Sequence, residues 1–161
     1  MDGRPARDAA RPAERRAARV LVLDVDDRIL LLEGRDSTRP EVGTWWFTPG
    51  GGIDAGETPA EAARREVREE VGIELGELGA VVHERTTEFD FEAVHYRQRE
   101  VFYLARVPRG TRPSPAHLTP MEKRSLLGAR WWEIDALAAS GATVYPEGLP
   151  ALLCTLLDRA R

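Results

Sequence analysis

The hydrophobic and polar positions of this chain follow two different periods, and the period of two predicts strands. Acidic side chains alternate with apolar ones over residues 88–93, within two longer apolar-rich segments at 80–91 and 94–107. This alternation is typical of antiparallel strands with one polar face. Earlier in the chain, the apolar runs 20–25 and 29–32 flank an Asp-Asp turn and predict a hairpin of buried strands.

The helical period appears twice. Residues 59–71 carry an apolar stripe at helical spacing, and a second leucine-rich stripe follows residue 146. A short strand running into a helical turn is expected over 129–137. The order is therefore strands, helix, strands, helix. It predicts an α/β fold, an α/β/α sandwich around a mixed β-sheet, with no repeat or second domain.

The helix over 59–71 has strong signals at both ends. Thr58 is a good N-cap, because its hydroxyl can accept a hydrogen bond from a free backbone N–H. Pro59 suits the first helical position, and Glu61 completes a capping box with Thr58. Gly72 provides the left-handed stop.

Three carboxylates, Glu66, Glu69 and Glu70, lie within one sector of this helix beside its apolar stripe. One interpretation is a solvated helix with ion pairs four residues apart. It explains Glu66 and Glu70 poorly, because like charges at this spacing destabilise a helix. Carboxylates crowded beside a core-facing stripe suit a hard cation such as Mg²⁺ or Mn²⁺.

The segment 51–73 resembles the complete sequence motif of the Nudix (MutT-like) hydrolase family. Gly51 is followed by five residues and Glu57, then by seven residues and the run Arg-Glu-Val-Arg-Glu-Glu-Val-Gly-Ile of residues 65–73. Every constrained position of the motif is filled. The resemblance implies the Nudix-type sandwich and a Mg²⁺-dependent hydrolase, with Mn²⁺ as a substitute ion.

By this resemblance, Glu66, Glu69 and Glu70 bind the metal, and one of them takes a proton from the attacking water. Arg65 orients a carboxylate, and the carbonyl of Gly50 joins the metal ligands. Glu57 is expected to pin the junction between loop and helix. Gly52 stands where some relatives carry a lysine, so a lysine contact to phosphate is missing there.

Two glutamates outside the motif are further candidates for a metal ligand or general base. Glu100 is a lone carboxylate among larger side chains on its strand, and its more common role is to pair with an arginine across the sheet. Glu122 lies in the proline-rich stretch 108–127. A long loop of this kind is often functional, and in this family a glutamate on a mobile loop sometimes acts as the base.

Substrate contacts are harder to assign. Gly51 and Gly52 permit close approach of a ligand to the backbone, although a glycine triplet alone is also typical of a flexible turn. Arg35 is placed to reach a phosphate or simply lies on a surface loop. Trp46 offers a surface for base stacking, but core packing is the more common role of a tryptophan.

Length, charge and cysteine content bound the remaining possibilities. The 161 residues predict a flexible Arg/Ala-rich tail at 1–18 and one domain at 19–161. The formal net charge of −4 gives no basic surface for nucleic acid, and no apolar run is long enough to span a bilayer. Cys154 is the single cysteine, expected to be buried, which favours a cytoplasmic location. The sequence leaves open whether the protein forms a homodimer.

The expected function is cleavage of the diphosphate linkage in a nucleoside diphosphate joined to another moiety, with a nucleoside triphosphate as the default small-molecule substrate. One alternative is a silent Nudix-fold module that binds or senses a nucleotide, although such modules usually have damaged motifs. Another is isomerase chemistry on an isoprenoid diphosphate. That chemistry needs a cysteine in the site, and Cys154 in a terminal apolar helix is badly placed for it.

Overall fold

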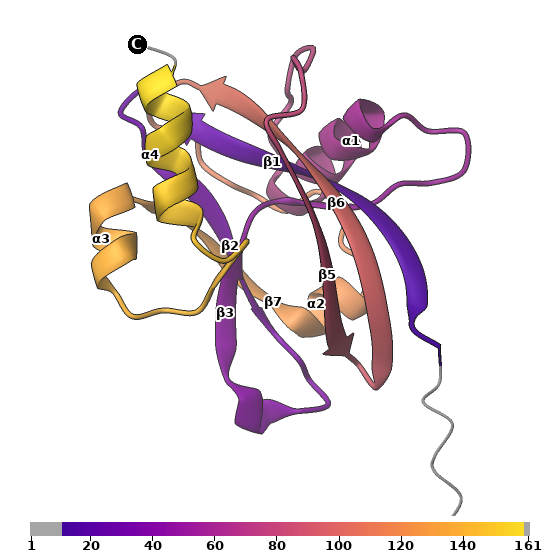
Figure 1. Ribbon diagram of the computed structural model, residues 1–161. Coiled ribbons are helices and arrows are strands. Elements are labelled where there is room, and N and C mark those ends of the chain that lie inside the picture. Colours follow the sequence, from indigo (N-terminus) through magenta and orange to yellow (C-terminus); the bar gives the residue numbers. More distant parts are fainter. Residues whose placement is uncertain (1–10, 160–161) are drawn as a thin grey trace, which may run out of the picture.

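A single mixed sheet runs through the molecule. The structure, a computed structural model, describes residues 11–159 (Figure 1). Within these residues eight strands join in the order β5-β6-β1-β2-β3-β8, while β4 pairs with β1 and β7 with β2. The strands are β1 (Ala13–Asp24), β2 (Ile29–Arg35), β3 (Thr44–Phe47), β4 (Gly50–Gly52), β5 (His83–Phe91), β6 (Val94–Val107), β7 (Leu126–Trp132) and β8 (Val144–Tyr145).

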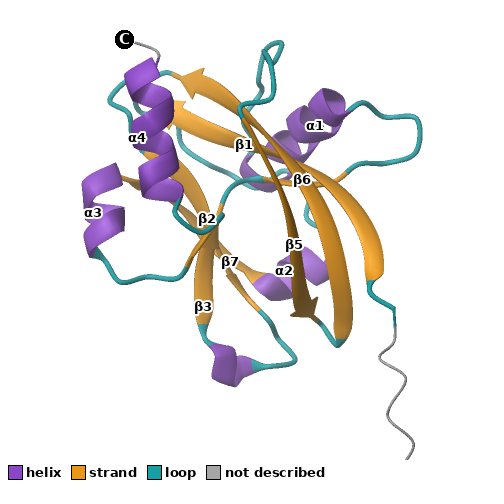
Figure 2. Ribbon diagram, viewed as in Figure 1, coloured by secondary structure: helices purple, strands orange, loops and turns teal. Residues whose placement is uncertain are grey.

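Helices cover both faces of this sheet, as the α/β/α prediction requires (Figure 2). They are α1 (Pro59–Val71), α2 (Pro120–Ser125), α3 (Ile134–Ala139) and α4 (Leu149–Arg159), together with one 3₁₀ turn, η1 (Pro40–Val42). α1 lies on one side of β1 and β6, whereas α3 and α4 lie together on the other side of the sheet. No helix among the described residues has the length and apolar character to cross a membrane.

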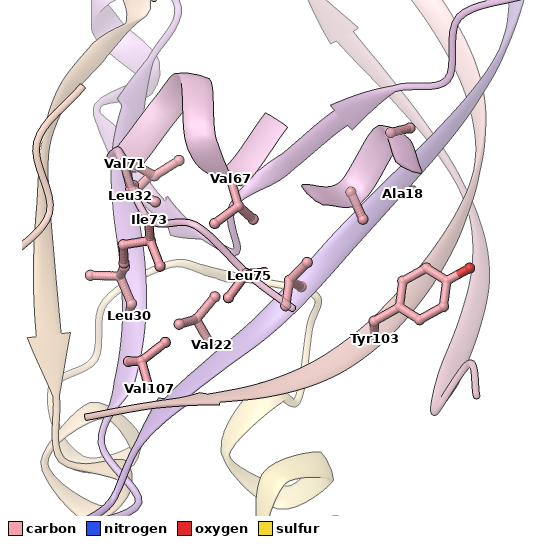
Figure 3. Close-up of a cluster of buried hydrophobic side chains, with 13 residues drawn as sticks. Ala18, Val22, Leu30, Leu32, Val67, Val71, Ile73, Leu75, Tyr103 and Val107 are labelled. Carbon is pink, nitrogen blue, oxygen red and sulfur yellow. The ribbon is translucent and has the colours of Figure 1, made fainter. Parts of the chain in front are cut away.

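Two hydrophobic clusters hold the layers together. The first joins α1 to the central strands, and Figure 3 shows its side chains converging from helix and sheet. Its fully or nearly fully buried members are Ala18, Val20, Val22, Leu30, Leu32, Ala62, Ala63, Val67, Val71, Ile73, Leu75, Tyr103 and Val107. The second packs α3 and α4 on the opposite face, around Leu21, Leu23, Ile29, Leu31, Phe102, Trp132, Leu137, Leu149 and Leu153.

β1 is the axis of the fold, and it begins earlier than the sequence suggested. It runs parallel to β6 over its whole length, from the pair Ala13–Tyr96 to the pair Asp24–Val107. The domain therefore includes residues 13–18, and the prediction that these residues belong to a flexible tail is wrong. The Arg/Ala composition hid a strand whose pairing partner lies 83 positions further along the chain. The remainder of the predicted tail, residues 1–10, lies outside the described residues.

Two other local expectations also change. Cys154 is exposed on α4 rather than buried, because the buried positions of that helix are Leu149 and Leu153. The proline-rich stretch 108–127 contains the short helix α2, which has its own capping box between Thr119 and Glu122.

Candidate functional site

The helix α1 is specified as the sequence predicts. Thr58 and Glu61 form a reciprocal capping box, and Gly72 ends the helix with a left-handed φ of 67°. The apolar stripe packs into the first cluster, and the same buried side of the helix carries Glu66 and Glu70, which are only 8% and 4% exposed. Two carboxylates are thus held at the edge of the core by a rigid, well-capped element.

The structure brings a third carboxylate to this pair. Oxygen atoms of Glu66, Glu70 and Glu122 all lie within 4.8 Å of one another. Glu122 arrives from α2, and we call these three side chains the carboxylate cluster. Burial raises the pKa of Glu66, and it raises the pKa of Glu70 well above its ordinary value. Both shifts show that negative charge is unfavourable here without a cation.

A proline-rich loop delivers Glu122 to the cluster. The backbone N–H of Ser114 donates to the carbonyl of Val71 at 2.8 Å, and that of Ala116 donates to the carbonyl of Glu69 at 3.0 Å. These bonds satisfy carbonyls at the C-terminal end of α1, which lack partners within the helix. The loop is therefore docked on α1, and it leads directly into α2 and Glu122.

The glycines of β4 make room for the cluster and bind it. The backbone N–H of Gly50 donates to Glu70 Oε2 at 2.9 Å in a buried bond. A Cβ atom at Gly51 would lie 2.6 Å from the Glu66 carboxyl carbon, so a side chain there would displace Glu66. Gly50 itself has a φ of 142°. The triplet is therefore a paired strand beside the carboxylates rather than a flexible turn.

Arg65 holds several acceptors at once. Its Nε and Nη2 donate to the two oxygens of Glu57 at 2.7 and 3.0 Å, which is the forked pairing of guanidinium and carboxylate. Its Nη1 donates to Glu66 at 2.8 Å, and Nη2 also reaches the carbonyl of Gly52 at 3.0 Å. The Arg65 hydrogen bond lowers the pKa of Glu57. Arg65 thus orients Glu66, and Glu57 pins the loop to the helix.

Glu69 does not join the cluster in this arrangement. Its carboxylate lies 3.3 Å from Arg65 Nη1, and its side chain is 28% exposed. The structure therefore separates Glu69 from Glu66 and Glu70, which the motif groups with it, and places Glu122 beside those two instead. The catalytic and metal-binding roles of Glu69, and the metal-binding role of the Gly50 carbonyl, stay predictions.

Glu100 is fully engaged elsewhere. Its Oε1 accepts hydrogen bonds from Arg19 Nε at 2.5 Å and Gln98 Nε2 at 2.7 Å, while its Oε2 accepts from Arg85. Burial raises the pKa of Glu100, but the two arginines outweigh burial and the net pKa is lowered. The cross-strand interpretation is confirmed, since Arg85 is the register partner of Glu100. Both oxygens of Glu100 accept hydrogen bonds in this arrangement, and its alternative role as ligand or base stays a prediction.

Arg35 and Trp46, the two predicted substrate contacts outside the motif, lie in different surroundings: Arg35 contacts the helix that carries Glu122, whereas Trp46 packs in the second hydrophobic cluster. Arg35 Nε donates to the carbonyl of Arg124 at 3.0 Å, which ties β2 to α2. Trp46 packs edge-on against Trp132, with ring centroids 5.1 Å apart, in the second hydrophobic cluster. That cluster covers the sheet face opposite α1, so Trp46 has the core-packing role, and stacking of Trp46 on substrate stays a prediction.

Comparison with known proteins identifies the family. The model of the NUDIX domain matches residues 13–152, which is most of the chain and includes the whole of β1. The chain belongs to the Nudix family. As a Nudix hydrolase it has relatives whose names describe diphosphatases and pyrophosphohydrolases.

Among these relatives, the dihydroneopterin triphosphate diphosphatase of Escherichia coli K12 is 33% identical over 118 residues, covering 70% of this chain and 73% of the relative. An uncharacterized Nudix hydrolase of Bacillus subtilis, YvcI, is 44% identical over 52 residues, which is only 29% of that protein.

Solved structures match over most of their length and support the same fold. The MutT protein of Methanosarcina mazei aligns with a TM-score of 0.64 at 16% identity, over 93% of this chain and 97% of that protein. A MutT Nudix hydrolase of Burkholderia pseudomallei aligns with a TM-score of 0.56 at 26% identity, over 76% and 85% of the two chains.

Proposed function

We propose that this Nudix hydrolase cleaves the diphosphate linkage of a nucleotide-type small molecule with the help of Mg²⁺. The observation that carries the proposal is the carboxylate cluster, in which Glu66, Glu70 and Glu122 place oxygens within 4.8 Å of one another. Oxygen donors of this number and charge suit Mg²⁺ or Mn²⁺, and the raised pKa values of the two buried members favour charge neutralisation by a cation.

The residues of the chain divide the work between them. Glu66, Glu70 and Glu122 would hold the ion, which supplies Lewis acidity and lowers the pKa of water. Arg65 fixes Glu66 through a 2.8 Å hydrogen bond, and the Gly50 N–H fixes Glu70 through a 2.9 Å bond. Preorganised ligands of this kind lower the cost of reaching the transition state. Glu69 is the proposed proton acceptor.

For the substrate we propose a triphosphate-bearing nucleotide or a related compound. The 33% identical relative carries the name dihydroneopterin triphosphate diphosphatase, and a pterin triphosphate shares its triphosphate chain with nucleoside triphosphates. A cytoplasmic location fits such substrates and the single cysteine, Cys154. A silent nucleotide-binding module is the outcome if no turnover is found.

The test is a phosphate and diphosphate release screen of the wild-type protein over nucleoside triphosphates, dihydroneopterin triphosphate, dinucleoside polyphosphates and nucleotide sugars. Each substrate is assayed with Mg²⁺ and with EDTA. Glu70→Gln is the test variant, and Glu74→Gln is its matched control, since Glu74 is an exposed carboxylate just beyond α1. We expect Mg²⁺-dependent turnover that Glu70→Gln loses and Glu74→Gln keeps. Turnover equal in Mg²⁺ and EDTA would refute the metal mechanism.

A further inference from the structure

Arg15 lies on β1 directly beside the glycine strand β4. Its side chain is partly buried, and the guanidinium lies beside the position that a side chain at Gly52 would take. A Cβ atom built on Gly52 would be 3.4 Å from Arg15 Nη2 and 3.5 Å from Nε. A Cβ atom at position 52 would therefore be in ordinary contact with a cationic group that comes from the neighbouring strand.

This guanidinium has no acidic partner among residues 11–159, in contrast to its neighbour Arg19. Arg19 pairs with the buried Glu100 at 2.5 Å. Arg15 instead lies over the ring of Tyr96, 6.0 Å from the ring centroid. Burial lowers the pKa of Arg15, and the positive charge of Arg19 lowers it further. A partly buried cation with five donors and a like charge nearby is well suited to bind an anion.

The position of Arg15 relative to the carboxylate cluster indicates which anion this is. Successive residues of a strand face opposite sides, so Gly51 faces Glu66 while Gly52 faces Arg15. β4 consists of glycines alone, so only its backbone separates the two sides, and among the described strands it pairs with β1 alone, which leaves its other edge unpaired. The negative charge of Glu66 is close enough to act on the pKa of Arg15. A diphosphate with one phosphate at the cluster would bring its neighbouring groups to this strand.

We propose that Arg15 binds a phosphate group of the substrate, on the side of β4 opposite the carboxylate cluster. The inference rests on the proposed function, since it assigns a further contact to the same diphosphate substrate. Forked donation by the guanidinium to two phosphate oxygens gives both affinity and orientation. Arg15 is thus a substrate-binding residue outside the motif of residues 51–73, and it lies on β1, in a segment that the sequence analysis assigned to a tail.

The test compares Arg15→Gln with Arg97→Gln in the full-length protein. Arg97 lies on β6 beside Tyr96, is about half exposed, and matches the loss of one positive charge. We measure kcat and KM for whichever substrate the screen identifies, and the affinity for inorganic pyrophosphate in the presence of Mg²⁺ by calorimetry. Removing a hydrogen bond to a charged group should weaken pyrophosphate binding by about tenfold to a hundredfold. KM should rise by a similar factor, while Arg97→Gln stays within about twofold of wild type.

A rescue variant separates binding from a structural role. Gly52 faces the space that Arg15→Ala vacates, so Gly52→Lys in that background should return an amine to the same place and restore part of the pyrophosphate affinity. The Mg²⁺-induced rise in Tm should be unchanged in Arg15→Gln, because the metal ligands are intact.

The outcomes distinguish the inference from the proposed function. If wild type turns over substrate and Arg15→Gln behaves like Arg97→Gln in KM and pyrophosphate affinity, the inference is wrong and the hydrolase stands. If no substrate is cleaved but pyrophosphate binding depends on Arg15, the contact stands and the hydrolase proposal fails. Absence of pyrophosphate binding to the wild-type protein, or loss of stability without loss of affinity in Arg15→Gln, overturns the inference.

Discussion

Replacing Glu70 by glutamine removes one charge from the carboxylate cluster while keeping the shape of the side chain. The amide oxygen still accepts the N–H of Gly50, which binds Glu70 at 2.9 Å. Two charges 4.8 Å apart repel each other by about 3 kcal/mol at an effective dielectric constant of about 20. Because burial raises the pKa of Glu66 and Glu70, full charge on both is unfavourable, and we expect only part of this repulsion as a gain, about 1–2 kcal/mol.

The prediction is therefore that metal-free Glu70→Gln is more stable than metal-free wild type. A gain of about 1–2 kcal/mol corresponds to a Tm increase of roughly 2–8 °C for a domain of this size. The assay is thermal unfolding in EDTA, followed by titration with Mg²⁺. Wild type should be stabilised strongly by Mg²⁺ and the variant weakly, because it lacks one anionic ligand.

The stability of the metal-free protein should also change with pH in a defined direction. A carboxyl group with a raised pKa in the native state binds its proton more tightly than in the unfolded chain. Metal-free wild type should therefore lose stability as the pH rises from about 4.3, the ordinary glutamate value, through the raised native pKa. Glu70→Gln should show a smaller loss over the same window. A metal-free variant that is less stable than wild type, with an unchanged Mg²⁺ response, would refute the reasoning.

Three further predictions concern the surroundings of the cluster. Glu100→Ala should cost about 3–5 kcal/mol of unfolding free energy in urea melts, because it leaves two partly buried arginines without their partner; a cost below about 1 kcal/mol would contradict this. The hydrogen bond from Thr38 lowers the pKa of Asp36 to about 2. The contribution of ionised Asp36 to the stability of the fold should therefore be lost as the pH falls from about 4 through 2. Asp36→Asn should reduce this loss in acid titrations. Gly51→Ala should lower kcat/KM by about tenfold or more, because its Cβ would lie 2.6 Å from the Glu66 carboxyl carbon. A variant with wild-type kcat/KM would contradict that close packing.

The sequence predicted α1 closely because its signals are local. Thr58, Pro59, Glu61 and Gly72 specify both ends within a single segment, and the structure has the helix at Pro59–Val71. Because these signals are local, the sequence also predicted correctly that Arg65, Glu66 and Glu70 lie close together on α1. The mixed sheet and its helices also followed from the order of periodic segments.

The parts that the sequence did not predict depend on contacts between distant segments. Glu122 was one candidate among several, and its place beside Glu66 comes from the docking of the loop on the carbonyls of α1. Arg15 was assigned to a tail because its strand has no apolar alternation, and only the pairing of β1 with β6 reveals it. A residue in a strand can face either side of the sheet. Trp46 faces the second hydrophobic cluster, where it packs against Trp132.

The proposed mechanism requires Glu66, Glu70 and Glu122 together to hold a divalent ion. The most direct measurement is the anomalous diffraction of crystals soaked in Mn²⁺, compared between wild type and Glu122→Gln. We expect a strong anomalous peak in wild type bounded by oxygens of all three glutamates, and a weakened or absent peak in the variant. A wild-type peak ligated without Glu122, or none near α1, would contradict it.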